Sequence, residues 1–278
     1  ACLGAVLASG SLRAADAGDP ADVFALPGEA NIVEEEHFGI VNGMATVGIP
    51  FKSVAAVSGL FAPPWVSSDF RLALSVGGRN VATDRYVWHP YAVSREGSTD
   101  GLRVRTAATL VPGFRGGRMT VAIDNPSDQT RDVSLQWTVG GTLDRTAVWE
   151  FARPASHSAT QPIQTGASLL LAHGEGALAI AWTAATQLQK PSGVLQPIQV
   201  SLAPHATWLG CVVFAVGSKA EAANALSAIG QHPETSAERW EMTPPNARDA
   251  KAAKPVCRAD ETYRRHVADV FEKLPRLR

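Results

Sequence analysis

The sequence predicts a mainly β protein, in which a large antiparallel β-sandwich is followed by short linker helices and a C-terminal amphipathic helix. Between about residues 31 and 217, short segments of alternating apolar and polar residues recur roughly every ten residues, with no helical pattern between them. The 24 glycines and 18 prolines supply the turns that so many strands need. This spacing favours a sandwich, because a parallel sheet would require helices between its strands.

The composition indicates a globular protein. The chain has 278 residues, of which 45% are hydrophobic and 18% are charged, and its net charge is −1. A disordered chain is less apolar and carries a larger net charge. The balanced charge gives no electrostatic reason to expect nucleic acid, so no nucleic-acid partner is predicted.

Residues 1–17 have the pattern of the end of a secretory signal peptide. An apolar run from Cys2 to Ala8 is followed by Ala15-Asp16-Ala17, which fits an A-x-A cleavage site. We therefore expect export to the periplasm or out of the cell. No other stretch approaches the roughly 18 unbroken apolar residues of a membrane span, so no membrane association is expected after leader removal.

The predicted strands follow one another with turn residues between them. The first clear strand covers 70–76 and ends at Gly77-Gly78, the aromatic-rich segment 85–93 follows, and residues 102–106 alternate cleanly. The strand at 119–123 leads into a turn at 124–128, because Asx side chains bond the local backbone and proline fixes φ. Further strands are expected at 133–139, 168–172, 177–183, 197–202 and 207–216.

The pattern changes from strand to helix at Ser218. Ser218 and Glu221 have the spacing of a capping box, which predicts a helix over 219–229 that stops at Gly230. A second short helix is expected at 234–241, and the proline-containing stretch 243–255 is typical of a linker. Residues 258–274 form an amphipathic helical pattern with one apolar stripe, which consists of Tyr263, Val267, Val270, Phe271 and Leu274.

These patterns divide the chain into four parts. We predict a signal-peptide remnant at 1–17, a β-sandwich domain at 18–217, and linker helices with a proline-rich linker at 218–255. An amphipathic helix needs something to bury its stripe, either the sandwich or a further domain. We predict that residues 256–278 are the first helix of a truncated helical catalytic domain.

Three stretches together resemble a known family of enzymes. They are 119–139, 201–217, and the segment from 218–226 through 237–240 to the linker and amphipathic helix. This organisation resembles the N-terminal β-sandwich (supersandwich) domain of six-hairpin, (α/α)-toroid glycoside hydrolases, of the glucoamylase-like or trehalase-like kind. The resemblance implies that a C-terminal helical barrel of the same polypeptide is the partner of the sandwich. It also places the catalytic acid and base beyond residue 278, so no catalytic residue is assigned.

The residues themselves carry no catalytic or metal motif. The sequence lacks a nucleophile elbow, a P-loop, a dinucleotide fingerprint and a zinc-protease motif. Its seven histidines lack ligand spacing, so neither a metal nor a cofactor is predicted. The acidic run Glu34-Glu35-Glu36 does not suit paired-carboxylate chemistry, because adjacent residues on a strand point to opposite faces.

Two aromatic clusters are the candidate carbohydrate contacts. Aromatic faces stack on the C–H surface of sugar rings, and neighbouring polar groups bond the hydroxyls. Packing within the sandwich is the alternative explanation of the same residues. The candidates are Trp65, Trp88, His89, Tyr91 and Arg95.

Three functions compete on this basis. The first is a non-catalytic sandwich portion of an exported glycoside hydrolase, which supports a missing (α/α) barrel and lends aromatic loops to its sugar site. The second is a stand-alone carbohydrate-binding module. The third is a structural or interaction sandwich whose terminal helix docks a partner protein. The sequence favours the first, because the change from strand to helix at Ser218 is followed by an amphipathic helix without a visible partner.

Overall fold

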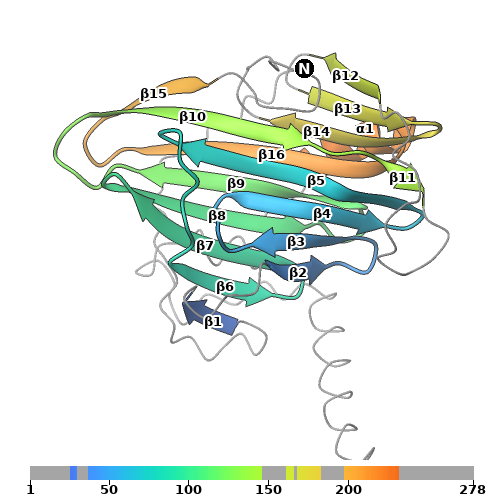
Figure 1. The fold of residues 1–278 in the computed structure, drawn as a ribbon, viewed down its shortest axis with the longest axis horizontal. Coiled ribbons are helices and arrows are strands. Elements are labelled where there is room, and N and C mark those ends of the chain that lie inside the picture. The colour runs from blue at the N-terminus through green and yellow to red at the C-terminus, as the bar shows by residue number, and fades with distance from the viewer. Residues whose placement is uncertain (1–25, 30–36, 146–160, 166–167, 183–196, 232–278) are drawn as a thin grey trace, which may run out of the picture.

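The chain forms two antiparallel β-sheets stacked face to face, with one helix on the outer face of the larger sheet (Figure 1). The computed structural model describes residues 26–29, 37–145, 161–165, 168–182 and 197–231. The predicted leader at 1–17, the second short helix, the linker and the amphipathic helix at 258–274 lie outside the described residues. The prediction of a mainly β, antiparallel sandwich is confirmed.

Nine strands make up the larger sheet. Their spatial order is β1 (Leu26–Glu29), β6 (Arg85–His89), β7 (Ala92–Thr99), β8 (Leu102–Leu110), β9 (Gly116–Asp124), β16 (Thr207–Ser218), β14 (Gly176–Trp182), β13 (Ser168–His173) and β12 (Gln161–Thr165). The pairing of β9 with β16 joins segments that are far apart in the chain.

Seven strands make up the smaller sheet. Their order is β15 (Ile198–Leu202), β10 (Arg131–Gly140), β5 (Trp65–Val76), β4 (Ala56–Ala62), β3 (Thr46–Pro50) and β2 (His37–Val41), and the short β11 (Asp144–Arg145) also pairs with β5. A register shift between Ser58 and Leu60 leaves Gly59 at φ 57°, a conformation that glycine adopts without steric cost.

The core lies between the two sheets. Alternate residues of each strand face inward, as in β10, where Val133, Leu135, Trp137 and Val139 are all buried. The rings of Phe70 and Phe214, from the two different sheets, lie 5.2 Å apart between their centroids. A fully buried apolar side chain stabilises a fold by about 1.5–3 kcal/mol, so this interior holds the layers together.

The predicted capping box starts the helix α1 (Lys219–Gln231). The Ser218 amide donates to Glu221 Oε2 at 2.8 Å, and the Glu221 amide donates to Ser218 Oγ at 3.3 Å. The predicted stop at Gly230 is wrong, because the helix continues through it to Gln231. Arg118 of β9 donates to the Ile229 carbonyl at 3.2 Å, which supplies a partner and a positive charge at this end of the helix.

Small residues on the outer face of the larger sheet receive α1. Ala222 packs against Ala177 and Ala179 of β14, and Ile229 packs against Val213 and Ala215 of β16. Short side chains let the helix approach the sheet closely. Within the described residues, no helix has the length and apolarity that a bilayer crossing requires.

The capping box predicts a pH-dependent contribution of Glu221 to stability. The hydrogen bond from the Ser218 amide lowers the pKa of Glu221 below its ordinary value of 4.5. A lowered pKa in the folded state means that the stabilisation is present above the unfolded-state pKa and is lost as the pH falls through the folded-state pKa. We expect the difference in Tm between wild type and Glu221→Ala to be larger at neutral pH than below about pH 4.

Glu221→Gln is the matched control for this prediction. Glutamine at this position also reaches back to the first amide of the box but carries no titrating carboxylate. The Tm difference between Glu221→Gln and Glu221→Ala should therefore change little with pH. An equal pH response in both variants would contradict the assignment.

Candidate functional site

The five predicted sugar-binding residues do not share one surface. Trp88 pairs with Val93, whereas His89 pairs with Ala92 on the opposite face of the same two strands. Val93 is part of the core between the sheets, so Trp88 points toward this core. His89 points toward the opposite face of the larger sheet. Arg95 lies two residues after Val93 and shares its inward face. Register therefore separates residues that are adjacent in the sequence.

Trp88 connects the two sheets. Its side chain is partly buried and packs against the core, and its Nε1 donates to the Gly39 carbonyl of β2 at 3.0 Å. We expect Trp88→Phe to keep most of the packing but to lower the free energy of unfolding by about 1 kcal/mol, because this hydrogen bond is lost. Urea unfolding measures the change. Unchanged stability together with weaker binding of a disaccharide would instead identify Trp88 as a sugar contact.

Arg95 is a buried cation in the sandwich interior. Its side chain is 2% exposed, and its Nη1 donates to the carbonyls of Pro50 and Ser53, both at 3.1 Å. Its Nη2 lies 3.8 Å from the sulfur of Met119. Burial lowers the pKa of Arg95 to about 9, so the guanidinium still carries its charge at neutral pH. Within the described residues Arg95 forms no ion pair, and its contacts fix the turn between β3 and β4.

His89 and Tyr91 occupy the β6–β7 hairpin. His89 is 2% exposed, Tyr91 is partly buried, and their ring centroids lie 6.3 Å apart. The Leu110 amide donates to the Tyr91 carbonyl at 2.9 Å, which holds the hairpin against the end of β8. At this exposure His89 offers a sugar ring almost no surface.

Trp65 lies in the other sheet, at the start of β5. Its ring covers the backbone of Gly176 in β14 so closely that a Cβ there would overlap the ring. The Arg145 guanidinium lies 5.8 Å from the ring centroid on the other strand of the β5–β11 pair. Trp65 therefore packs against the core, and the carbohydrate role of the five residues stays a prediction.

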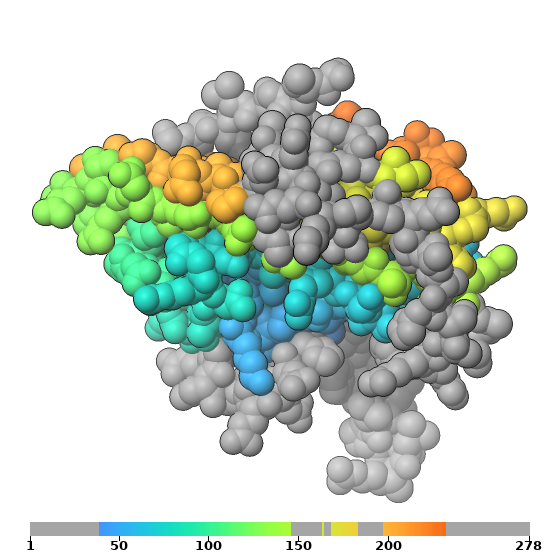
Figure 2. Space-filling view, turned by 45° about the horizontal axis from the view of Figure 1, so that its top comes forward, coloured from blue at the N-terminus to red at the C-terminus, as the bar shows by residue number. Residues whose placement is uncertain are grey.

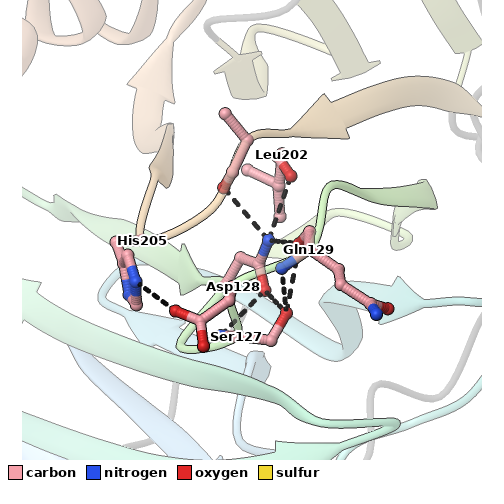
Figure 3. Close-up of polar contacts among 7 residues, drawn as sticks. Ser127, Asp128, Gln129, Leu202 and His205 are labelled. Carbon is pink, nitrogen blue, oxygen red and sulfur yellow. Dashed lines mark hydrogen bonds and ion pairs between the residues drawn. The ribbon is translucent and has the colours of Figure 1, made fainter.

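The turn that the sequence predicted at 124–128 forms a polar junction at one end of the sandwich (Figure 3). Asn125 is 1% exposed. Its Nδ2 lies 2.7 Å from the Gln129 carbonyl and 3.0 Å from the carbonyls of Leu202 and Ala203, and its Oδ1 accepts from the Ser127 hydroxyl at 2.7 Å. Asn125 thus joins the β9–β10 turn to the β15–β16 turn. Figure 2 shows these two segments, in green and orange, side by side at one end of the molecule.

A second, partly buried amide holds the other end of β9. Asn42 Nδ2 donates to the carbonyls of Val111 and Phe114 at 2.7 and 2.9 Å, and its Oδ1 accepts from the amides of Met44 and Ala45. These bonds join the β2–β3 turn to the β8–β9 turn. No local sequence pattern predicts this contact, because its two sides lie about 70 residues apart.

A small pocket of about 140 Å³ opens where the β7–β8 hairpin meets the ends of β5 and β10. Val76, Leu102 and Val133 contribute apolar surface, and charged side chains come from Asp100 and Arg131. Asp100 lies in the left-handed region at φ 48°, and its carboxylate is 3.3 Å from the Arg79 guanidinium. The sequence contains no signal for this pocket, because its residues come from separate strand ends and form no motif.

The described residues contain no group of three His, Cys, Asp or Glu side chains arranged to hold a metal ion. The acidic run Glu34-Glu35-Glu36 lies outside the part of the chain that the structure describes. In the described part, side-chain hydrogen bonds join the turns at Asn42 and Asn125, and charged side chains line the pocket beside Asp100.

Comparison with known proteins places the fold. No family model matches the chain, and no curated protein matches it. Among solved structures, a protein from the human microbiome assigned as a kojibiose phosphorylase matches with a TM-score of 0.52 and 8% identity, over 79% of this chain and 37% of that one. A bacterial glucoamylase solved with acarbose matches with a TM-score of 0.47 and 8% identity, over 84% of this chain and 39% of that one.

The chain therefore spans little more than a third of the length of the first of these proteins. At 8% identity the likeness concerns the fold alone. It agrees with the two antiparallel sheets and the helix described above. The chain has the fold of the N-terminal β-sandwich region of such an enzyme.

Proposed function

We propose that the chain is the non-catalytic sandwich portion of an exported carbohydrate-active enzyme and supports a helical catalytic domain outside residues 1–278. The observation that carries this proposal is the fold, because the solved protein that shares it over 37% of its length is assigned as a kojibiose phosphorylase. A glycoside hydrolase or a glycoside phosphorylase would use the sandwich in the same way.

The arrangement at the end of the sandwich supports this role. Strand β16 runs directly into α1, and α1 packs on the outer face of β14 and β16. Arg118 fixes the last turn of the helix to β9. The end of α1 is thus held at a fixed position on the sandwich, which suits the support of a further domain.

Activity measurements on the isolated chain test the proposal. We expect residues 18–278 to fold and to show neither hydrolysis nor phosphorolysis of glucosides such as kojibiose. We also expect the gene to continue beyond codon 278 into a frame that encodes paired helices. Turnover by the purified chain, or a stop codon directly after Arg278, would contradict the proposal.

Export is part of the same proposal. The A-x-A pattern at Ala15 and Ala17 supports it. N-terminal sequencing of protein expressed from its own full-length gene should give a mature chain that begins at or near Gly18. An uncleaved leader on cytosolic protein would be evidence against export.

A further inference from the structure

We infer that the pocket between the β7–β8 hairpin and the ends of β5 and β10 binds one pyranose ring of a neutral carbohydrate. The inference rests on the proposed function for the class of ligand and on the pocket for its place. It assigns the sugar contact to Asp100 and Arg131, away from the aromatic residues that the sequence favoured.

The lining of the pocket suits a sugar ring. Val76, Leu102 and Val133, which are 1%, 4% and 7% exposed, form a narrow apolar floor that a C–H group of a pyranose can contact. Ser134 and Asp100 stand beside this surface and offer oxygen atoms to ring hydroxyls. A polyhydroxylated ring needs this combination, because it presents apolar C–H groups and polar hydroxyls together.

The charges around the pocket favour a neutral ligand. Asp100 and Asp132 are negative, and Arg131 and the neighbouring Arg79 are positive, so the four charges balance. A net anion or cation would gain little from such a set. A hydroxyl can accept from a guanidinium and donate to a carboxylate at once, and hydrogen bonds to ionised groups are about twice as strong as neutral ones.

The pocket is held in shape before any ligand arrives. The Gly77 amide donates to the Ser134 carbonyl at 2.8 Å, which joins the end of β5 to β10. A Cβ at Gly101, which lies at φ 78°, would be in ordinary contact with the Arg131 guanidinium, 3.5 Å from Nη2. The backbone around the pocket is therefore ordered before binding, whereas the exposed Asp100 and Arg131 side chains lose conformational freedom when they bind.

The volume limits the ligand to a single ring. About 140 Å³ lies below the 300 Å³ or more of drug-sized sites. A chain end with one inserted ring fits, whereas a longer segment must extend into solvent. We expect weak binding, with a Kd on the order of 1 mM for a monosaccharide.

NMR titration of ¹⁵N-labelled full chain with D-glucose and with kojibiose tests the inference. We expect chemical-shift changes at the amides of Gly77, Asp100, Gly101 and Ser134. Asp100→Asn keeps a residue that tolerates the left-handed conformation but removes the charge. Asp100→Asn and Arg131→Gln should each weaken binding about tenfold through the loss of a charge-assisted hydrogen bond.

Arg85→Gln is the matched control, because Arg85 is also an exposed strand arginine but lies on β6, away from the pocket. It should bind both sugars as the wild type does. If Arg131→Gln does not fold, Ser134→Ala removes a lining hydroxyl instead. No shift changes with either sugar, changes centred on Trp65 or Trp88, or tighter binding of inorganic phosphate than of glucose would each overturn the inference.

This result is separable from the proposed function. Catalytic turnover by the isolated chain would contradict the supporting role of the sandwich. It would leave the sugar-induced chemical-shift changes around Asp100 unaffected. If the gene continues into a helical domain but the pocket shows no chemical-shift changes with sugar, only the sugar site is contradicted, and the supporting role remains.

Discussion

Arg95→Ala is expected to lower the free energy of unfolding by about 3 kcal/mol. The substitution leaves the carbonyls of Pro50 and Ser53 without their donor in the sandwich interior. It also opens a cavity beside Met119, because a long side chain that is 2% exposed is lost. Urea unfolding monitored by tryptophan fluorescence measures the change.

Arg95→Met separates the two causes of this loss. Methionine refills much of the volume and removes a buried charge, which is often neutral or stabilising by itself. It does not restore a donor for the two carbonyls. We therefore expect Arg95→Met to recover about half of the loss, since the cavity contribution disappears. Arg85 is an exposed residue on the neighbouring strand β6. The free energy of unfolding of Arg85→Ala should therefore stay within about 0.5 kcal/mol of the wild-type value. An equal, small effect of all three variants would show that the guanidinium does not hold the β3–β4 turn.

Asn125→Ala is expected to cost about 3 kcal/mol, because each buried group left without its partner costs about 1–3 kcal/mol. The Asn125 amide lies within hydrogen-bond distance of carbonyls in two separate turns, and its oxygen accepts from Ser127. Asn125→Asp should be destabilising as well, since a carboxylate would face the carbonyls of Leu202 and Ala203 in place of a donor. Thermal unfolding of the full chain measures both changes.

An exposed contact between Asp128 and His205 beside this junction provides the control. Asp128 Oδ1 and His205 Nε2 lie 3.0 Å apart in the same two turns, but the Asp128 side chain is 96% exposed. Exposed pairs contribute about 0–1 kcal/mol, so Asp128→Ala should change stability little. A larger effect for Asp128→Ala than for Asn125→Ala would mean that charge, and not the buried amide, joins the turns.

The sequence was sufficient to predict most strands from β5 onward, but it did not predict β2, β3 and β4 or which strands are neighbours. Alternation and turn residues located the segments that became β8, β9 and β10, because a half-buried strand imposes a period of two. They could not show that β9 pairs with β16, since that contact depends on packing between segments about 90 residues apart. The capping box at Ser218 could be predicted because it is a local feature. Its hydrogen bonds join residues only three positions apart.

The candidate site shows the same limit. Trp88, His89 and Arg95 stand close together in the sequence and have the composition of a sugar contact. Pairing with Val93 and Ala92 sends two neighbours to opposite faces, and burial gives Arg95 a structural contact. The pocket at Asp100 and Arg131 had no sequence signal. The sequence shows which residue types are adjacent along the chain. It does not show which strand ends come together in space, and the pocket depends on that arrangement.

Asn42 and Asn125 hold the two opposite ends of β9, and this affects how the strand opens to solvent. Strands open from their ends, and each end of β9 is fastened by an asparagine side chain to a turn that belongs to other strands. Fraying at either end would first release those turns. Amide protons of β9 should therefore exchange with solvent only when both sheets unfold together, which makes this strand the centre of one cooperative unit.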